Sequence, residues 1–203
     1  MSQIALPLGT GPGASPRRIV VGNANASAVE ALRRPQDWPF RTAVLAGPPR
    51  SGKSLMARWF AYNGLGEAID DARLLDETEL FHRWNRAQES DTPLLLIGGA
   101  GDWTIALPDL ASRLGAALHL DIGVPDDAML ADLILAHAEA RGLALGPDAA
   151  AYLVPRCERS HLAVERLVAT IDRLSLERKA PPGQAIWRAA LEALNGESQP
   201  RLL

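Results

Sequence analysis

With 203 residues, 47% of them apolar, the chain can bury a proper core and is long enough for one large domain or for a base with a small second domain. Its formal net charge of −3 is spread through both halves without a basic block, which argues against strong direct binding of nucleic acid and favours a protein partner. The single cysteine, Cys157, excludes an internal disulfide, and no run approaches the roughly 18 apolar residues of a membrane span, so we expect a cytoplasmic protein without a membrane anchor.

The N-terminal segment Gln3-Ile4-Ala5-Leu6-Pro7-Leu8 precedes a stretch rich in Gly, Pro and Ser, from Gly9 to Pro16. Such a stretch forms no regular element, so we predict a flexible tail over residues 1–16. An extended peptide anchored by Leu6 and Leu8, with Pro7 restricting the backbone, suits a groove on a partner. The alternative is a frayed terminus whose leucines fold back onto the domain.

Two elements are expected before the first strand of the core. A helix from about Ala26 to Arg34 is capped by Asn25 or Ser27 and ended by Pro35. A turn from Gln36 to Phe40 then leads to the apolar strand Thr42 to Ala46. We expect Trp38 to pack beneath this strand rather than against the base of a nucleotide.

The strand continues into Gly47-Pro48-Pro49-Arg50-Ser51-Gly52-Lys53-Ser54, which has the G-x-x-x-x-G-K-S pattern of the phosphate-binding loop (P-loop) and leads into a helix. The two glycines let backbone N–H groups curl around phosphate oxygens, and the positive end of the helix dipole faces the anion. Lys53 is predicted to neutralise the β- and γ-phosphates, and Ser54 to ligate Mg²⁺. The eight residues together predict a nucleotide site.

Two adjacent carboxylates, Asp70 and Asp71, follow the short apolar pair Ala68-Ile69. P-loop proteins place the acid on the Mg²⁺ side at the end of such a strand, the Walker-B position. Asp70 is therefore a candidate Mg²⁺ residue, and both are candidate catalytic residues. A solvated acidic turn that caps the following helix is the alternative.

The pattern after Asp71 predicts further elements of an α/β fold. They are a helix from Asp76 to Asn85, an apolar strand from Leu94 to Ile97, a short helix from Leu110 to Leu114 and an alternating strand from Ala117 to Ile122. Gly98-Gly99-Ala100-Gly101 ends the apolar strand, so no side chain there can sense a phosphate. Arg113, in the short helix, is expected to be exposed.

From Pro125 onward the sequence predicts helices alone. Asp126 caps a helix to about Arg141, Pro147 opens a second to about Val154, Ser160 opens a third through Leu176, and Gln184 to Leu194 form a fourth. We therefore predict a tail over 1–16, an α/β base with a parallel sheet over 17–124, and an all-helical lid over 125–203. The four histidines show no ligand spacing, so a metal site built on them is not expected.

Over nearly its whole length the chain resembles the Hda family, short DnaA-related AAA+ regulators of replication initiation. QIALPL is similar to the family's sliding-clamp-binding motif, and Ile19-Val20-Val21-Gly22 to Asn25 resembles the segment that approaches adenine. WPFRTAVLAGPPRSGKS matches the P-loop block. LPDLASRL, Leu107 to Leu114, is similar to the box that carries an arginine finger, which falls on Arg113.

The resemblance implies roles that the residues alone do not give. Gln3, Leu6, Pro7 and Leu8 would bind the sliding clamp, the β subunit of the DNA polymerase, while Val20, Val21 and Asn25 would join the P-loop around ADP or ATP with Mg²⁺. Arg113 would act in trans, as a finger that stimulates ATP hydrolysis by DnaA and so prevents re-initiation. A homodimer is also possible in this family.

Three departures from the family pattern limit what can be carried over. Only Asn63 to Glu67 remain where the family has another strand and helix, so we predict a sheet that is one strand smaller. Gly98-Gly99 replaces the polar sensor-1 residue, and Glu165 falls at the sensor-2 arginine position, with Arg166 as a candidate substitute. We therefore expect weak or absent intrinsic ATPase activity. The alternative is a helicase-loader-like AAA+ ATPase that uses Lys53, Ser54, Asp70 and Asp71 for its own hydrolysis.

Overall fold

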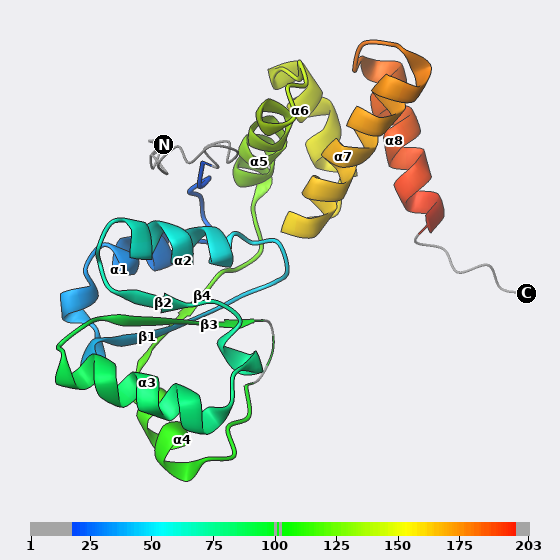
Figure 1. Cartoon of the computed structure of the whole chain (residues 1–203). Coiled ribbons are helices and arrows are strands. Elements are labelled where there is room, and N and C mark those ends of the chain that lie inside the picture. The colour runs from blue at the N-terminus through cyan, green and yellow to red at the C-terminus, as the bar shows by residue number, and fades with distance from the viewer. Residues whose placement is uncertain (1–17, 100, 102, 198–203) are drawn as a thin grey trace, which may run out of the picture. The chain divides into compact units, whose positions relative to one another are not determined.

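A computed structural model describes residues 18–99, 101 and 103–197 of the chain (Figure 1). The chain divides into two compact units, residues 1–123 and 124–203. The first unit combines a sheet with helices, and the described part of the second is helical. The predicted α/β base with a helical C-terminal part is thus confirmed.

The sheet of the first unit is parallel throughout, and its strands have the order β2-β3-β1-β4. The strands are β1 (Thr42–Ala46), β2 (Glu67–Ile69), β3 (Leu94–Gly99) and β4 (Leu118–Asp121). The P-loop strand β1 is central, while the three-residue β2 is an edge strand. The prediction of a smaller sheet is confirmed, because the described residues form four strands and none pairs with the outer edge of β2.

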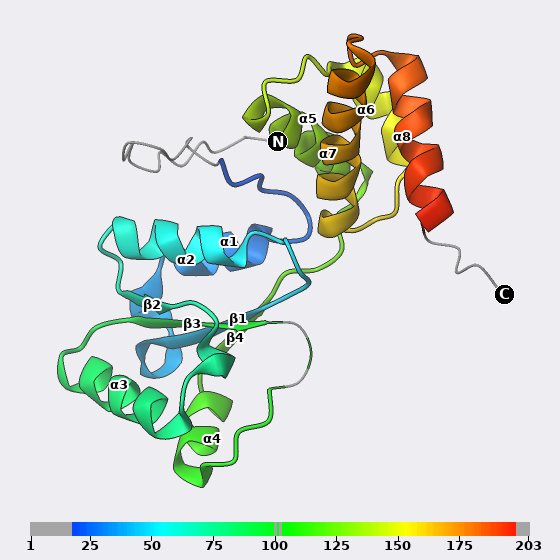
Figure 2. The same ribbon diagram turned by 45° about the vertical axis from the view of Figure 1, so that its right-hand side comes forward.

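Helices cover both faces of this sheet. They are α1 (Ala26–Leu32), α2 (Lys53–Tyr62), α3 (Glu77–Glu89) and α4 (Pro108–Gly115), with the 3-10 turns η1 (Pro35–Asp37), η2 (Pro39–Arg41) and η3 (Ala72–Leu74). Helices α1 and α2 lie on one face and α3 and α4 on the other (Figures 1 and 2). Burial on both faces explains why β3 is apolar throughout: Leu94, Leu95 and Leu96 have no exposed surface.

The helix after the two aspartates is capped by a different acid. Asp76 occupies the N-cap of α3, and its Oδ1 accepts hydrogen bonds from the backbone N–H groups of Thr78 (2.9 Å) and Glu79 (3.1 Å). Asp71 precedes η3 but makes no side-chain capping bond. The capping alternative for Asp70 and Asp71 therefore loses its main support.

Trp38 is a core residue of the first unit. It is 4% exposed, its ring stacks on Phe60 with 5.3 Å between the centroids, and its Nε1 donates to the carbonyl of Ala31 at 2.9 Å. Both its apolar ring and its one donor are satisfied by the protein, which confirms the structural role.

The second unit is built from α5 (Asp127–Ala140), α6 (Pro147–Leu153), η4 (Val154–Arg156), α7 (His161–Arg178) and α8 (Gln184–Glu197). The predicted caps are confirmed: Asp126 accepts from the N–H of Met129 at 2.8 Å, and Ser160 from that of Ala163 at 3.0 Å. Leu167 and Ile171 of α7 are fully buried in its core. Among the described residues, no helix is long and apolar enough to cross a bilayer.

The cysteine of this unit is a packing residue. Cys157 is half-buried, and burial, followed by the neighbouring Glu158 carboxylate, raises the pKa of its thiol to about 11. A thiol that stays protonated near neutral pH is a poor nucleophile.

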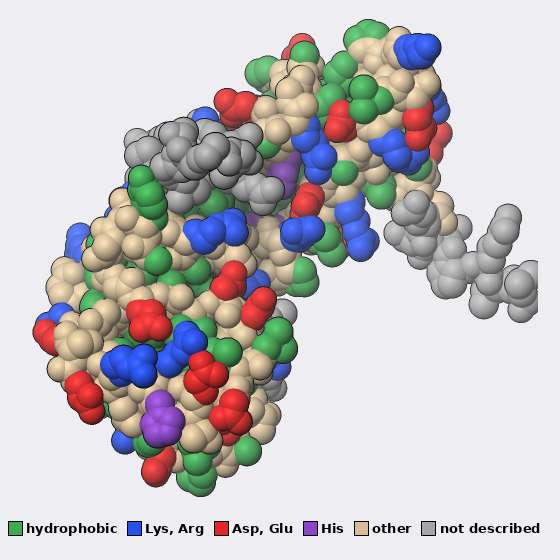
Figure 3. Space-filling view, viewed as in Figure 1, with side chains coloured by type: hydrophobic (Ala, Val, Ile, Leu, Met, Phe, Trp, Pro, Cys, Tyr) green, Lys and Arg blue, Asp and Glu red, His purple; other side chains and the backbone are tan. Residues whose placement is uncertain are grey.

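On the face shown in Figure 3, acidic and basic side chains are interspersed over the surface of the first unit.

Candidate functional site

The P-loop joins the end of β1 to the start of α2, and Lys53 and Ser54 are the first two residues of that helix. Gly52 precedes them with a φ of 92°, and its carbonyl accepts the first helical bond, from the N–H of Met56 at 2.9 Å. The N–H groups of the first helical turn have no partner within the helix, so they are directed at the loop. The local geometry is therefore that of an anion site at a helix N-terminus.

Gly47 pins the beginning of the loop between two strand ends. Its N–H donates to the carbonyl of Gly99 at 3.2 Å, and a Cβ at this position would lie 2.8 Å from Cβ of Ile122. Its φ of 148° is also unfavourable for an L side chain. Only glycine fits here, which explains the first position of the motif in terms of packing as well as phosphate binding.

The lysine of the motif lies across the loop. Its Nζ donates to the carbonyls of Gly47 and Pro48, both at 2.8 Å. Burial lowers the pKa of Lys53, while the carboxylates of Asp70 and Asp71 act in the opposite direction. The fold thus brings the two aspartates, 17 and 18 positions away in the sequence, within electrostatic reach of the P-loop lysine.

The oxygen ligands at this edge of the sheet fit Mg²⁺. Asp70 and Asp71 are both exposed, and Ser54 is half-buried at the start of α2. Among the described residues there is no cluster of three or more His, Cys, Asp or Glu side chains that could hold a metal unaided. This composition suits Mg²⁺, which is usually held by one or two carboxylates together with substrate phosphates and water.

The segment predicted to approach adenine is held in shape by Asn25. This residue is 2% exposed; its Nδ2 donates to the carbonyl of Val20 at 2.8 Å, and its Oδ1 accepts from the N–H of Gly22 at 2.9 Å. Asn25 stands at the N-cap of α1 but makes no side-chain capping bond, so the predicted cap is wrong. Its amide instead closes the turn, which makes it a positioning residue.

This turn meets the P-loop at the end of β4. The N–H of Gly123 donates to the carbonyl of Ala24 at 2.8 Å, and the preceding residue, Ile122, is the one that packs on Gly47. Val20 is buried and Val21 half-buried. The sequence-predicted residues Val20, Val21 and Asn25 thus belong to the same edge of the unit as the loop.

Other predicted residues lie at the loop or away from it. Pro49 and Arg50 are exposed at its tip, Pro48 is half-buried, and Ser51 is 5% exposed. Arg166 is exposed on α7 in the second unit, beside the half-buried Glu165. Gln3, Leu6, Pro7 and Leu8 lie outside the described residues.

Arg113 is not exposed as predicted, because α3 holds its side chain. Its guanidinium carbon lies 4.4 Å from the ring centroid of Phe81 and 4.3 Å from that of Trp84. The guanidinium also donates to Oδ1 of Asn85. Cation–π contacts of this kind stabilise by about 0.5–2 kcal/mol each. The side chain of Arg113 is therefore held by its own unit. We call this group of four residues, Phe81, Trp84, Asn85 and Arg113, the arginine clasp.

A second contact ties the other end of α4 to α3. The Glu77 carboxylate accepts hydrogen bonds from the N–H groups of Ala106 (2.9 Å) and Leu107 (2.6 Å) just before α4 begins. The sequence predicted the helix from Asp76 to Asn85 but gave no role to Glu77 or Asn85. Both residues lie in the predicted helix, but their partners are 28–30 residues away, and no sequence pattern predicts those contacts.

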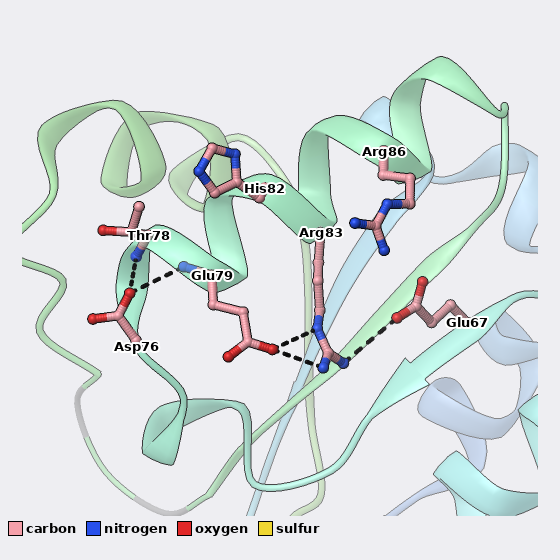
Figure 4. Close-up of a pocket in the computed structure, with 7 residues that line it drawn as sticks. All are labelled: Glu67, Asp76, Thr78, Glu79, His82, Arg83 and Arg86. Carbon is pink, nitrogen blue, oxygen red and sulfur yellow. Dashed lines mark hydrogen bonds and ion pairs between the residues drawn. The ribbon is translucent and has the colours of Figure 1, made fainter.

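A shallow hollow between α3 and the edge strand β2 is not a candidate functional site. It is lined by Glu67, Asp76, Thr78, Glu79, His82, Arg83 and Arg86 (Figure 4). Arg83 lies between Glu79, at 2.8 Å, and Glu67, at 3.8 Å. These charges neutralise one another, and charged side chains beside a short edge strand protect it from pairing with other chains.

Comparisons with known proteins place this geometry in a fold. No family model matches the sequence, and no curated protein matches it. Domain III of the Thermotoga maritima replication initiation protein DnaA is similar with a TM-score of 0.70 and 15% identity, over 86% of this chain and 93% of that one. The T. maritima RuvB Holliday junction branch migration motor is similar with a TM-score of 0.60 and 20% identity, over 85% and 69%.

A replication initiator DnaA, solved with AMPPCP and single-stranded DNA, is similar with a TM-score of 0.59 and 17% identity, over 79% of this chain and 66% of that one. Identities this low establish a shared fold and nothing finer. The chain therefore has the AAA+ P-loop fold, with a sheet reduced to four strands.

Proposed function

We propose that this protein binds ADP or ATP with Mg²⁺ at its P-loop and acts as a DnaA-related regulator of replication initiation. The observation that carries the nucleotide site is the convergence of Lys53 with Asp70 and Asp71 at the edge of the sheet where the loop lies. A DnaA with the same fold was solved with the ATP analogue AMPPCP, which supports this choice of ligand.

The regulatory part of the proposal rests on the sequence resemblance. QIALPL, with Gln3, Leu6, Pro7 and Leu8 as its anchors, docks on the sliding clamp, and Arg113 is offered to ATP-bound DnaA. An arginine supplied in trans neutralises charge on the transferring phosphoryl group and is worth about 10³–10⁵ in rate. The chain's own turnover is low, because Gly98 and Gly99 offer no polar side chain and Arg166 is at best a substitute for the arginine replaced by Glu165.

The arginine clasp adds a condition to this mechanism. Arg113 must leave two aromatic rings and the Asn85 amide before it can reach a phosphate on another protein. Breaking these contacts costs about 1–3 kcal/mol. Contacts with the partner must offset that cost, so Arg113 acts only within an assembled complex.

Calorimetric titration of the full chain with Mg-ADP and Mg-ATP tests the nucleotide site. We expect binding by the wild type and a loss of at least about 100-fold in Lys53→Ala, because a charged contact to two phosphates is removed. Arg58→Ala is the matched control, since Arg58 is an exposed cation on the same helix α2. A wild-type chain that binds neither nucleotide would refute this part.

Hydrolysis of ATP by DnaA, measured with DNA-loaded clamp, tests the regulatory part. The wild type is expected to stimulate hydrolysis, Arg113→Ala to lose about 10³-fold of the stimulation, and Gln3→Ala with Leu6→Ala to lose capture by the clamp. Clamp capture that survives the double substitution would contradict the docking role.

A second candidate is an ATPase in its own right, favoured by the position of Asp70 and Asp71 near Lys53. In that case the isolated chain would turn over ATP at a rate comparable to active AAA+ enzymes, and Lys53→Ala would abolish it. Equal turnover by wild type and Lys53→Ala would leave the regulator as the supported function.

A further inference from the structure

The end of β3 lies against the start of the P-loop but carries no side chain. Gly99 pairs with Ala46 in the parallel register of β3 and β1, and its carbonyl accepts a hydrogen bond from the N–H of Gly47 at 3.2 Å. A polar side chain at this strand end would be well placed to contact a phosphate bound in the loop. Gly98 and Gly99 provide none.

A side chain from another element occupies this place. A Cβ at Gly99 would lie 3.4 Å from Cδ and 3.5 Å from Nη1 of Arg73, so the Arg73 side chain crosses the face of the glycine. Arg73 is the middle residue of η3, two positions after Asp71. The structure thus brings a cation that sequence reasoning did not single out against Gly99, the residue whose carbonyl accepts the hydrogen bond from Gly47.

The backbone before Arg73 fixes this position. Asp71 has a φ of 48°, a left-handed conformation that turns the chain sharply after β2. The next residue, Ala72, is 1% exposed and packs in the core between the sheet and α3. The turn at Asp71 and the burial of Ala72 fix the backbone of η3. Asp71 and Arg73 therefore flank the buried Ala72 at the same edge of the sheet.

The conformation of Gly99 complements the arginine. Its φ of +78° lies in the left-handed region, where L side chains are strained, and any Cβ would meet the aliphatic stem of Arg73. A Cβ at Gly99 would be in ordinary van der Waals contact with Arg73, so Arg73 covers the face of Gly99, and the positive φ is what favours glycine there. A guanidinium forms bidentate, charge-assisted hydrogen bonds with phosphate oxygens.

We propose that Arg73 contacts the γ-phosphate of ATP bound at the P-loop, in place of the polar side chain that β3 lacks. The inference rests on the proposed nucleotide binding at Lys53 and deepens it, because it makes the site able to distinguish ATP from ADP. Arginine carries donors only, so it neutralises the phosphate without accepting a hydrogen bond from an attacking water. The site would therefore distinguish ATP from ADP by the γ-phosphate, although Arg73 cannot itself orient the attacking water.

Calorimetric titration with Mg-ATP and Mg-ADP tests the inference on the wild type, Arg73→Ala, Arg73→Lys and Lys53→Ala. We expect Arg73→Ala to weaken ATP binding about tenfold and ADP binding less than about twofold, since one charge-assisted contact is lost with ATP alone. Arg73→Lys should fall between wild type and Arg73→Ala, because it keeps the charge but not the planar fork. Arg86→Ala is the matched control, an exposed arginine on α3.

The outcomes separate this inference from the proposed function. If Lys53→Ala abolishes binding while Arg73→Ala weakens ATP and ADP equally, or neither, the role of Arg73 is refuted and the nucleotide site stands. If the wild type binds neither nucleotide, both fall. Circular dichroism and the melting temperature of Arg73→Ala would establish that the variant is folded before its two affinities are compared.

Discussion

Two cations carried by recognisable motifs, Lys53 and Arg113, are treated very differently by the first unit. Lys53 donates hydrogen bonds to two carbonyls of the P-loop, and two exposed carboxylates lie within its electrostatic reach. Arg113 packs on the rings of Phe81 and Trp84 and bonds to Asn85, on helices that cover the face of the sheet opposite α2. The partners of Lys53 lie within its own motif, whereas those of Arg113 lie on another helix.

The difference shows that a motif fixes a backbone position more firmly than the direction of a long side chain. The P-loop lysine has its partners within the motif itself, so its placement follows from local sequence. The partners of Arg113 lie on another helix, and three of them together hold the guanidinium. Substitutions in the loop should therefore lower nucleotide binding, whereas substitutions in the arginine clasp should lower stability and leave nucleotide binding intact.

The largest expected effect is that of Gly47→Ala, which tests the loop side. The added methyl group would lie 2.8 Å from Cβ of Ile122 and 3.1 Å from its carbonyl oxygen, so backbone must move. We expect a loss of about 2–4 kcal/mol in the free energy of unfolding, measured in urea, and loss of nucleotide binding.

Gly115→Ala is the matched control for Gly47→Ala. Gly115 is the last residue of α4, and a Cβ there meets nothing within 4 Å. It should leave stability unchanged or raise it by up to about 1 kcal/mol. Equal losses in both variants would mean that the close approach at Gly47 is not what holds the loop.

Arg113→Ala tests the clasp side. It should lower the free energy of unfolding by about 1–3 kcal/mol, because two ring contacts and a hydrogen bond are lost, while nucleotide affinity stays within about twofold of wild type. Arg83→Ala is the control: its ion pair with Glu79 on α3 is exposed, so the expected loss is below about 1 kcal/mol. If Arg113→Ala is as stable as wild type, the clasp does not stabilise the fold.

The double substitution Asp70→Asn with Asp71→Asn tests the electrostatics of the loop side. Burial lowers the pKa of Lys53 and the two carboxylates raise it, so their removal shifts that pKa further down. The lysine must be protonated to hold phosphates, and we therefore expect nucleotide affinity to be lost at a lower pH than in wild type as the pH is raised. Titrations in the presence of Mg²⁺ from pH 7 to 10 would measure the shift, and coincident profiles would argue against the coupling.

The smallest expected effect is that of Asn85→Ala, which opens the clasp without removing the rings. The loss of one hydrogen bond to the guanidinium, about 1 kcal/mol, should make Arg113 available roughly five times as often. Stimulation of DnaA at limiting concentrations of this protein should rise by up to that factor. Reduced stimulation would show that Asn85 presents Arg113 to the partner instead of retaining it.

The sequence by itself determined those features whose partners are close along the chain. The strand, loop and helix of the P-loop, the caps Asp126 and Ser160, and the α/β base followed by helices all follow from local patterns of apolar, glycine and capping residues. The smaller sheet was predicted by comparison with the family pattern. The sequence also located the acidic pair Asp70 and Asp71, but it did not show that the cap of the following helix is Asp76.

Tertiary structure decided which distant residues share one place. The amide of Asn25 closes its own turn, and Arg113 contacts two rings of α3. Arg73 lies against Gly99, 26 positions further along the chain. The physical reason is that long polar side chains reach neighbours set by sheet order and helix packing, which local periodicity does not encode. The P-loop could be identified from the sequence, whereas the position of Arg73 beside it could be identified only from the tertiary structure.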